Sequence, residues 1–125
     1  MKKLSAVILG AFALYSLANA AKPWDGSYAV FNGKYLIYSG DLGEAAAPTP
    51  TDRKAALVLH GEAAKTLFES IGPDRKDACG TSYGMRVREK GDLDCTYDKD
   101  DRASPYVCHI GIDLRTGKSM HGSIC

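Results

Sequence analysis

Hydrophobic and polar residues alternate over two stretches in the second half of the chain. Residues 92–97 place Leu93, Cys95 and Tyr97 at every second position, and residues 106–114 repeat this pattern. A period of two is typical of a β-strand with one buried face. Shorter β-rich segments, bounded by turns that contain glycine, lie on either side. The pattern predicts four strands, at residues 85–88, 92–97, 106–114 and 118–125.

A different spacing occupies the middle of the chain. Apolar residues in the segment 62–71 recur at intervals of three and four, which is typical of one face of a helix: Ala64, Leu67, Phe68 and Ile71. The preceding segment 54–60 is a short apolar run that fits a buried strand, and Gly61 interrupts it. Gly72-Pro73 is a signal for the end of a helix. We therefore predict a strand followed by a single helix.

The first β-rich segments flank an Asn-Gly pair. Residues 27–31 and 34–38 surround Asn32-Gly33. Both residues of this pair tolerate a positive φ, so the pattern predicts a hairpin with a two-residue turn. Residues 43–53 include two prolines, which remove backbone donors and favour a surface loop.

Taken together, these elements predict an α+β fold. Their order is two strands, a loop, a strand and a helix, and then four strands. A run of antiparallel strands with a helix on one face is an α+β arrangement. We expect a small antiparallel sheet of about six or seven strands, with one helix packed on it and two disulfides.

The first twenty residues have the three-part pattern of a secretory signal peptide. Met1-Lys2-Lys3 is basic, Leu4 to Leu17 is almost entirely apolar, and Ala18-Asn19-Ala20 supplies small residues before a cleavage site. The alternative is a retained membrane anchor, but a spanning helix needs about 20 apolar residues and this run is shorter. We predict cleavage after Ala20, so that residues 21–125 form one periplasmic or secreted domain.

Four cysteines follow in the second half of the chain: Cys79, Cys95, Cys108 and Cys125. An even number of cysteines in a small exported domain indicates disulfides. A metal site is the alternative, but the closely spaced pairs common in structural zinc sites are absent from the sequence. Four cysteines allow three connectivities, and the sequence alone does not choose among them. Cys95 and Cys108 fall on the inward faces of consecutive predicted strands, so we expect them to bond to each other if those strands pair. The remaining pair would then be Cys79–Cys125.

The last two strands are predicted to form a hairpin. A three-residue loop with Gly117 in the left-handed conformation would place Ile112 opposite Met120 and Cys108 opposite Ile124. This register keeps the apolar residues on one face, whereas a slip by one residue would mix the two faces.

The same register predicts a histidine cluster on the outward face. His121 would lie opposite Gly111, diagonal to both His109 and Asp113. Two imidazoles beside a carboxylate could bind a metal ion or act as acid and base. The alternative is an ordinary polar sheet face in contact with water.

Aromatic residues gather near the start of the mature chain. Trp24, Phe31 and Tyr38 are candidates for a binding surface, because tryptophan and tyrosine are enriched at the centres of protein interfaces. These residue types are also common in strands, so burial in the domain is the alternative.

Charge narrows the range of partners. The chain has 16 basic and 15 acidic residues. Without a basic excess, binding to nucleic acid or, after signal cleavage, to an anionic membrane is not expected. No cofactor motif or catalytic constellation is evident in the sequence.

We therefore predict a small non-enzymatic binding protein that acts on another exported protein as an inhibitor, an immunity factor or an accessory factor. The alternative function is a small secreted hydrolase or metal-binding protein that uses His109, Asp113 and His121.

Overall fold

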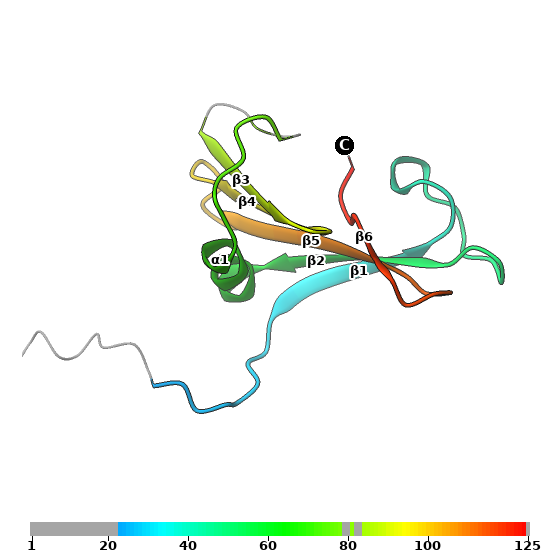
Figure 1. The fold of residues 1–125 in the computed structure, drawn as a ribbon, viewed down its shortest axis with the longest axis horizontal. Coiled ribbons are helices and arrows are strands. Elements are labelled where there is room, and N and C mark those ends of the chain that lie inside the picture. The colour runs from blue at the N-terminus through cyan, green and yellow to red at the C-terminus, as the bar shows by residue number, and fades with distance from the viewer. Residues whose placement is uncertain (1–22, 79–80, 82–83, 125) are drawn as a thin grey trace, which may run out of the picture.

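The computed structural model describes residues 23–78, 81 and 84–124 (Figure 1). The predicted signal peptide at residues 1–20, Cys79 and Cys125 all lie outside the described residues. The elements in chain order are β1 (Asn32–Tyr38), the 3₁₀ helix η2 (Leu42–Glu44), β2 (Lys54–His60), α1 (Gly61–Ser70), β3 (Met85–Lys90), β4 (Leu93–Asp98), β5 (Tyr106–Asp113) and β6 (Ser119–Met120).

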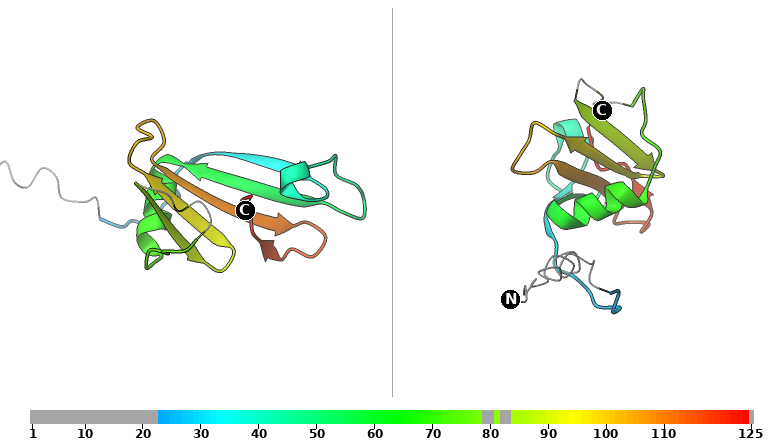
Figure 2. Two further views of the ribbon diagram at one scale, coloured as in Figure 1. Left: turned by 90° about the horizontal axis from the view of Figure 1, so that it is seen from above. Right: turned by 90° about the vertical axis from the view of Figure 1, so that its left-hand side faces the viewer.

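Six strands form one antiparallel sheet in the order β1-β2-β5-β4-β3, with β6 paired to β5. Helix α1 packs on one face of this sheet, against β5, β4 and β2. Figure 2 shows that α1 lies at one end of the sheet, far from the loop between β1 and β2. The predicted α+β fold with a single helix is confirmed for the described part of the chain.

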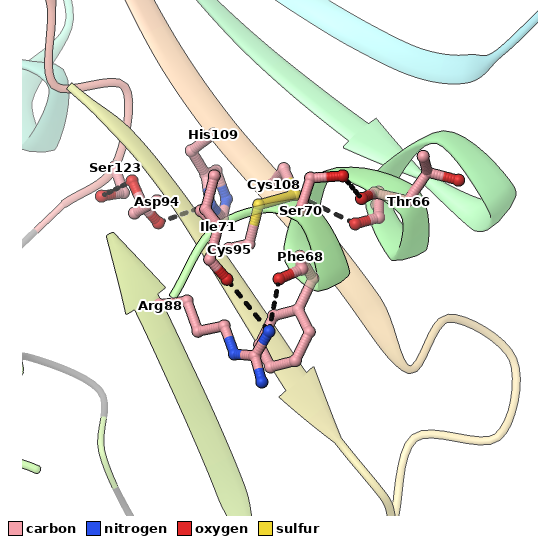
Figure 3. Close-up of a disulfide and its surroundings, with 11 residues drawn as sticks. Thr66, Phe68, Ser70, Ile71, Arg88, Asp94, Cys95, Cys108, His109 and Ser123 are labelled. Atoms are coloured by element: carbon pink, nitrogen blue, oxygen red, sulfur yellow. Dashed lines mark hydrogen bonds and ion pairs between the residues drawn. A yellow bond between two sulfur atoms is a disulfide. The ribbon is translucent and has the colours of Figure 1, made fainter. Parts of the chain in front are cut away.

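The core lies between α1 and the centre of the sheet. Ala64 and Phe68 on the helix are buried against Cys95 and Cys108. These cysteines are register partners on β4 and β5 and form a disulfide, as the sequence predicted (Figure 3). The Phe68 ring also meets the ring of Tyr106 edge-on, with the centroids 5.5 Å apart.

Arg88 on β3 fixes the end of the helix. Its Nη1 donates hydrogen bonds to the carbonyl oxygens of Phe68 and Ile71, which lie at the helix C-terminus where carbonyls lack helical partners (Figure 3). The guanidinium group also lies over the Phe68 ring, 4.3 Å from its centroid. Asp74 pairs with Arg88 and with Arg86, each at 2.7 Å. The loop after the helix is thereby tied to the edge of the sheet.

The predicted hairpin around Asn32-Gly33 is wrong. Both residues lie inside β1, and neither has a positive φ. Strand β1 pairs along its whole length with β2, from Asn32 opposite His60 to Tyr38 opposite Lys54. Pairing with β2 joins β1 to the central sheet, whereas a local hairpin would have left it as an isolated ribbon of low stability.

The predicted register of the last hairpin is also wrong, by one residue. Met120 lies opposite Gly111 and Ser119 lies opposite Ile112, so the connection is longer than the three-residue loop that we expected. Gly117 does adopt a positive φ of 75°, and its N–H donates to the Asp113 carbonyl. A wider turn that still uses Gly117 therefore shifts the register.

Two glycines allow the C-terminal segment to cross β5 closely. A Cβ on Gly122 would lie 2.4 Å from the carbonyl carbon of Ile110, and a Cβ on Gly111 would lie 2.8 Å from the His121 carbonyl oxygen. Such separations are too short for any side chain, so both positions require glycine. The crossing holds the segment after β6 against the face of the sheet opposite α1.

The close crossing predicts that Gly122→Ala destabilises the fold. The methyl group would meet backbone rather than a movable side chain, and overpacking of this kind costs about 1–3 kcal/mol. Urea unfolding measures the loss. The matched control is Gly43→Ala, whose Cβ would have its nearest neighbour at 3.9 Å. Equal stability of the two variants would contradict the close crossing.

The Asp74 cluster predicts a component of stability that depends on pH. Hydrogen bonds lower the pKa of the Asp74 carboxyl to about 2, and the bond from Arg86 contributes more than the bond from Arg88. Because the folded-state pKa is depressed, this stabilisation is present above about pH 4 and is lost as the pH falls toward 2. Asp74→Asn should be less stable at neutral pH and should approach the wild type in that acidic range. Thermal unfolding of both proteins, from neutral pH down to this acidic range, measures the difference in stability. A difference that is the same at every pH would contradict a role for the ionised Asp74 carboxylate.

Candidate functional site

His109 lies on β5 beside Asp94 on β4, its register partner. His109 Nδ1 is 3.2 Å from one carboxylate oxygen of Asp94, and the Ser123 hydroxyl donates to the other at 2.9 Å (Figure 3). The Asp94 side chain is only 11 % exposed and that of His109 is 24 % exposed. The three residues form a partly buried polar chain that ties the C-terminal segment to the central strands.

The predicted cluster of His109, Asp113 and His121 does not assemble. His121 Nε2 is 3.8 Å from the carboxylate of Asp92, and the Asp113 carboxylate accepts a hydrogen bond from the backbone N–H of Arg115. The register shift explains this outcome, because Met120 takes the place opposite Gly111 that we expected for His121. Among the described residues, no group of three or more histidine, cysteine, aspartate or glutamate side chains is placed to hold a metal ion.

The order of contacts in the polar chain decides what chemistry it can perform. In a nucleophilic triad the serine bonds the histidine, which then takes its proton. Here the Ser123 hydroxyl bonds Asp94 instead, so His109 is not placed to activate it. Asp94 engages Nδ1 and leaves Nε2 as the ring atom that can meet a ligand, since Nε2 makes no hydrogen bond within the described residues.

His109 also lines a groove on the face of the sheet opposite α1. One row of register partners crosses this face from Lys34 on β1 through Val58 on β2 to His109 and then Asp94. The groove has a volume of about 410 Å³, and its walls come from η2 and the C-terminal segment. We call it the His109 groove, and its lining residues include Lys34, Leu36, Leu42, Val58, His109 and Ile124.

A second hollow lies on the other face of β1 and β2, beside α1, whose Leu67 lines it. It has a volume of about 530 Å³ and includes Phe31, Tyr35, Leu57, Leu67 and Ile110 in its lining. Alternation along β1 places Tyr35 on this face and Leu36 on the other. The outer part of the sheet is therefore apolar and hollowed on both sides.

The aromatic residues predicted to form a binding surface differ in their exposure to solvent. Trp24 and Phe31 are 92 % and 63 % exposed, whereas Tyr38 is only 2 % exposed and cannot contribute to a surface. Tyr38 is buried, and Lys54 lies over its ring, 5.6 Å from the centroid.

The exposed apolar residues on β1 itself are Tyr35 and Leu36, at 72 % and 47 %. We missed them because the predicted hairpin assigned their strand a different partner. We call Phe31, Tyr35 and Leu36 together the edge surface.

Comparisons of this chain with known protein families, curated proteins and solved structures found no match. Within the part of the chain that the structure describes, no helix is both long enough and apolar enough to cross a membrane.

The polar chain predicts unequal effects of two similar substitutions. Asp94→Asn replaces a largely buried carboxylate, which accepts a hydrogen bond from the Ser123 hydroxyl and contacts His109, with a neutral amide. The change should lower the free energy of unfolding by about 1–3 kcal/mol. Asp92→Asn alters a carboxylate that is 31 % exposed, and should cost less than about 1 kcal/mol. Urea unfolding of both variants checks the difference. A larger loss in Asp92→Asn would contradict the structural role of Asp94.

Proposed function

We propose that this chain is an exported, non-enzymatic binding protein that recognises another exported protein through the edge surface. The observation that carries the proposal is the position of β1. This strand pairs with β2 on one side, and no described strand covers its other side. Its exposed residues include Tyr35 and Leu36, both large and apolar.

An open edge of this kind favours binding to an extended segment. Edge strands present unpaired backbone groups, and soluble proteins usually protect them with proline, bulges or several charges. Strand β1 has seven residues that pair without a break, no proline and only one charged residue, Lys34. A partner segment can add to such an edge through main-chain hydrogen bonds, while side-chain pockets supply specificity. The hollows on the two faces of β1 and β2 are suited to that second role.

The segment before β1 enlarges the apolar surface. Trp24, Tyr28 and Val30 are each more than nine-tenths exposed, and Phe31 links them to the edge surface. Exposed aromatic residues beside an apolar patch are typical of interaction sites, because each ring contributes a large contact area. A partner that covers β1 would also reach this segment.

Export is the other half of the proposal. The pattern of residues 1–20 matches a cleaved signal peptide. A disulfide between Cys95 and Cys108 is stable in an oxidising compartment and is rare in the cytosol. Both features support a periplasmic or secreted location, where the partner is another exported protein and the chain acts as an inhibitor, immunity or accessory factor.

Photocrosslinking in the native host tests this function. A photoreactive phenylalanine analogue that replaces Tyr35 should crosslink the full-length, exported chain to one discrete exported protein. The same analogue at Thr66, which is exposed on α1, should not form that product. An excess of unlabelled wild type should compete for the partner. The Leu36→Lys variant should compete at least about tenfold less well, because it places a charge in the edge surface.

Two results would oppose the proposal. Equal crosslinking from Tyr35 and Thr66 would show that the edge has no preference for the partner. Equal competition by Leu36→Lys and the wild type would remove the edge surface from the interaction. Circular dichroism of each purified variant checks that the fold is intact.

A further inference from the structure

We infer that the His109 groove binds a small aliphatic carboxylic acid. The groove borders the edge surface, because Leu36 lines it, but its ligand is a small molecule whose binding is tested without a partner protein. The groove has a volume of about 410 Å³, within the range of about 300–1,000 Å³ that is usual for small-molecule sites.

The lining favours an alkyl chain. Ala56 and Val58 of β2 and Leu36 of β1 share the face of the sheet that forms the floor. Leu42 of η2 and Ile124 of the C-terminal segment line its sides. Ile124 is 70 % exposed although it is large and apolar, so a bound chain would bury surface that water now contacts.

The charges of the lining favour an acid. Lys34 is the one formally charged residue among those that line the groove, and it makes no ion pair or hydrogen bond within the described residues. No aspartate or glutamate is among these lining residues. A carboxylate beside the flexible Lys34 ammonium group would gain an attractive interaction, whereas an alkyl ammonium ion would be repelled.

His109 supplies the directional contact. The hydrogen bond between Nδ1 and Asp94 fixes one end of the ring, and the second oxygen of Asp94 is held by Ser123. Nε2 is the remaining polar atom of the ring, and His109 lines the groove. Nε2 can hydrogen-bond a carboxyl group whether the shared proton begins on the ring or on the acid. The groove therefore offers one directional polar contact and one mobile positive charge above an apolar floor.

Calorimetric titration of the purified mature protein tests the inference with three probes. The two carboxylates are used below their micellar concentrations, and decanol is used below its solubility limit. Decanoate should bind saturably at one site. Octanoate should bind about fifteenfold more weakly, because each buried methylene contributes about fourfold. Decanol should bind at least about fivefold more weakly than decanoate, because it lacks the charge that Lys34 attracts.

Matched variants place the site. Ile124→Asp puts a negative charge in the groove and should weaken decanoate binding at least about tenfold, whereas Leu114→Asp alters another exposed apolar residue that is not among the groove's lining residues. Lys34→Glu should weaken binding by a similar factor, with Lys90→Glu on the far edge strand as its control. None of these side chains is buried, so the fold should be retained, and circular dichroism checks it.

The inference fails if decanoate does not bind, or if decanol binds as tightly as decanoate. It also fails if Ile124→Asp and Leu114→Asp have equal effects, since decanoate would then occupy another surface. Because no partner protein is present in this assay, these outcomes are separate from those of the crosslinking experiment.

Discussion

The contact between helix α1 and the Cys95–Cys108 disulfide is the interaction on which the rest of the structure depends. The disulfide joins the two central strands β4 and β5, and the helix covers it with Ala64 and Phe68. Cys108 Sγ lies 3.4 Å from the Ala64 carbonyl oxygen, so the helix backbone lies directly on the crosslink. A small domain gains much from such a contact, because its apolar core alone provides limited stability.

This contact also determines where the sheet is left open. The helix has only ten residues, and Arg88 holds its C-terminal end beside β3. It can therefore cover the part of the sheet near β4 and β5 but does not extend over β1. The outer strands keep apolar residues on both faces without a covering helix, and both hollows lie there. The second hollow, on the face that α1 packs on, follows from the shortness of the helix, whereas the His109 groove lies on the opposite face of the sheet.

The sequence predicted most of the elements but only part of their arrangement. The helix, β2 and the strands β3 to β5 have strong periodic patterns, and they form close to where the patterns place them. The alternation that put Cys95 and Cys108 on inward faces favoured their bond, which also required the two strands to pair. The pairing of β1 was missed because Asn32-Gly33 is a local signal, while pairing with β2 is a long-range contact that no local pattern reports.

Prediction of the candidate site also required long-range strand pairing and register. The histidine cluster required one register of the last hairpin, and a single-residue difference placed His121 near Asp92 instead. The pairing of β4 with β5 placed His109 beside Asp94. No local pattern could place Asp92 and Asp94 beside the C-terminal residues Ser119 and Ser123, because these contacts depend on the order of the strands.

Hydrogen exchange along β1 tests most directly the central claim that the helix and disulfide secure one part of the sheet and leave the β1 edge open for a partner. In the free mature protein, amides of β4 and β5 should exchange slowly, and those of β1 that lack a strand partner should exchange quickly. In the crosslinked complex, the exchange of β1 should slow. Slow exchange of all β1 amides in the free protein, or no change in the complex, would contradict the account.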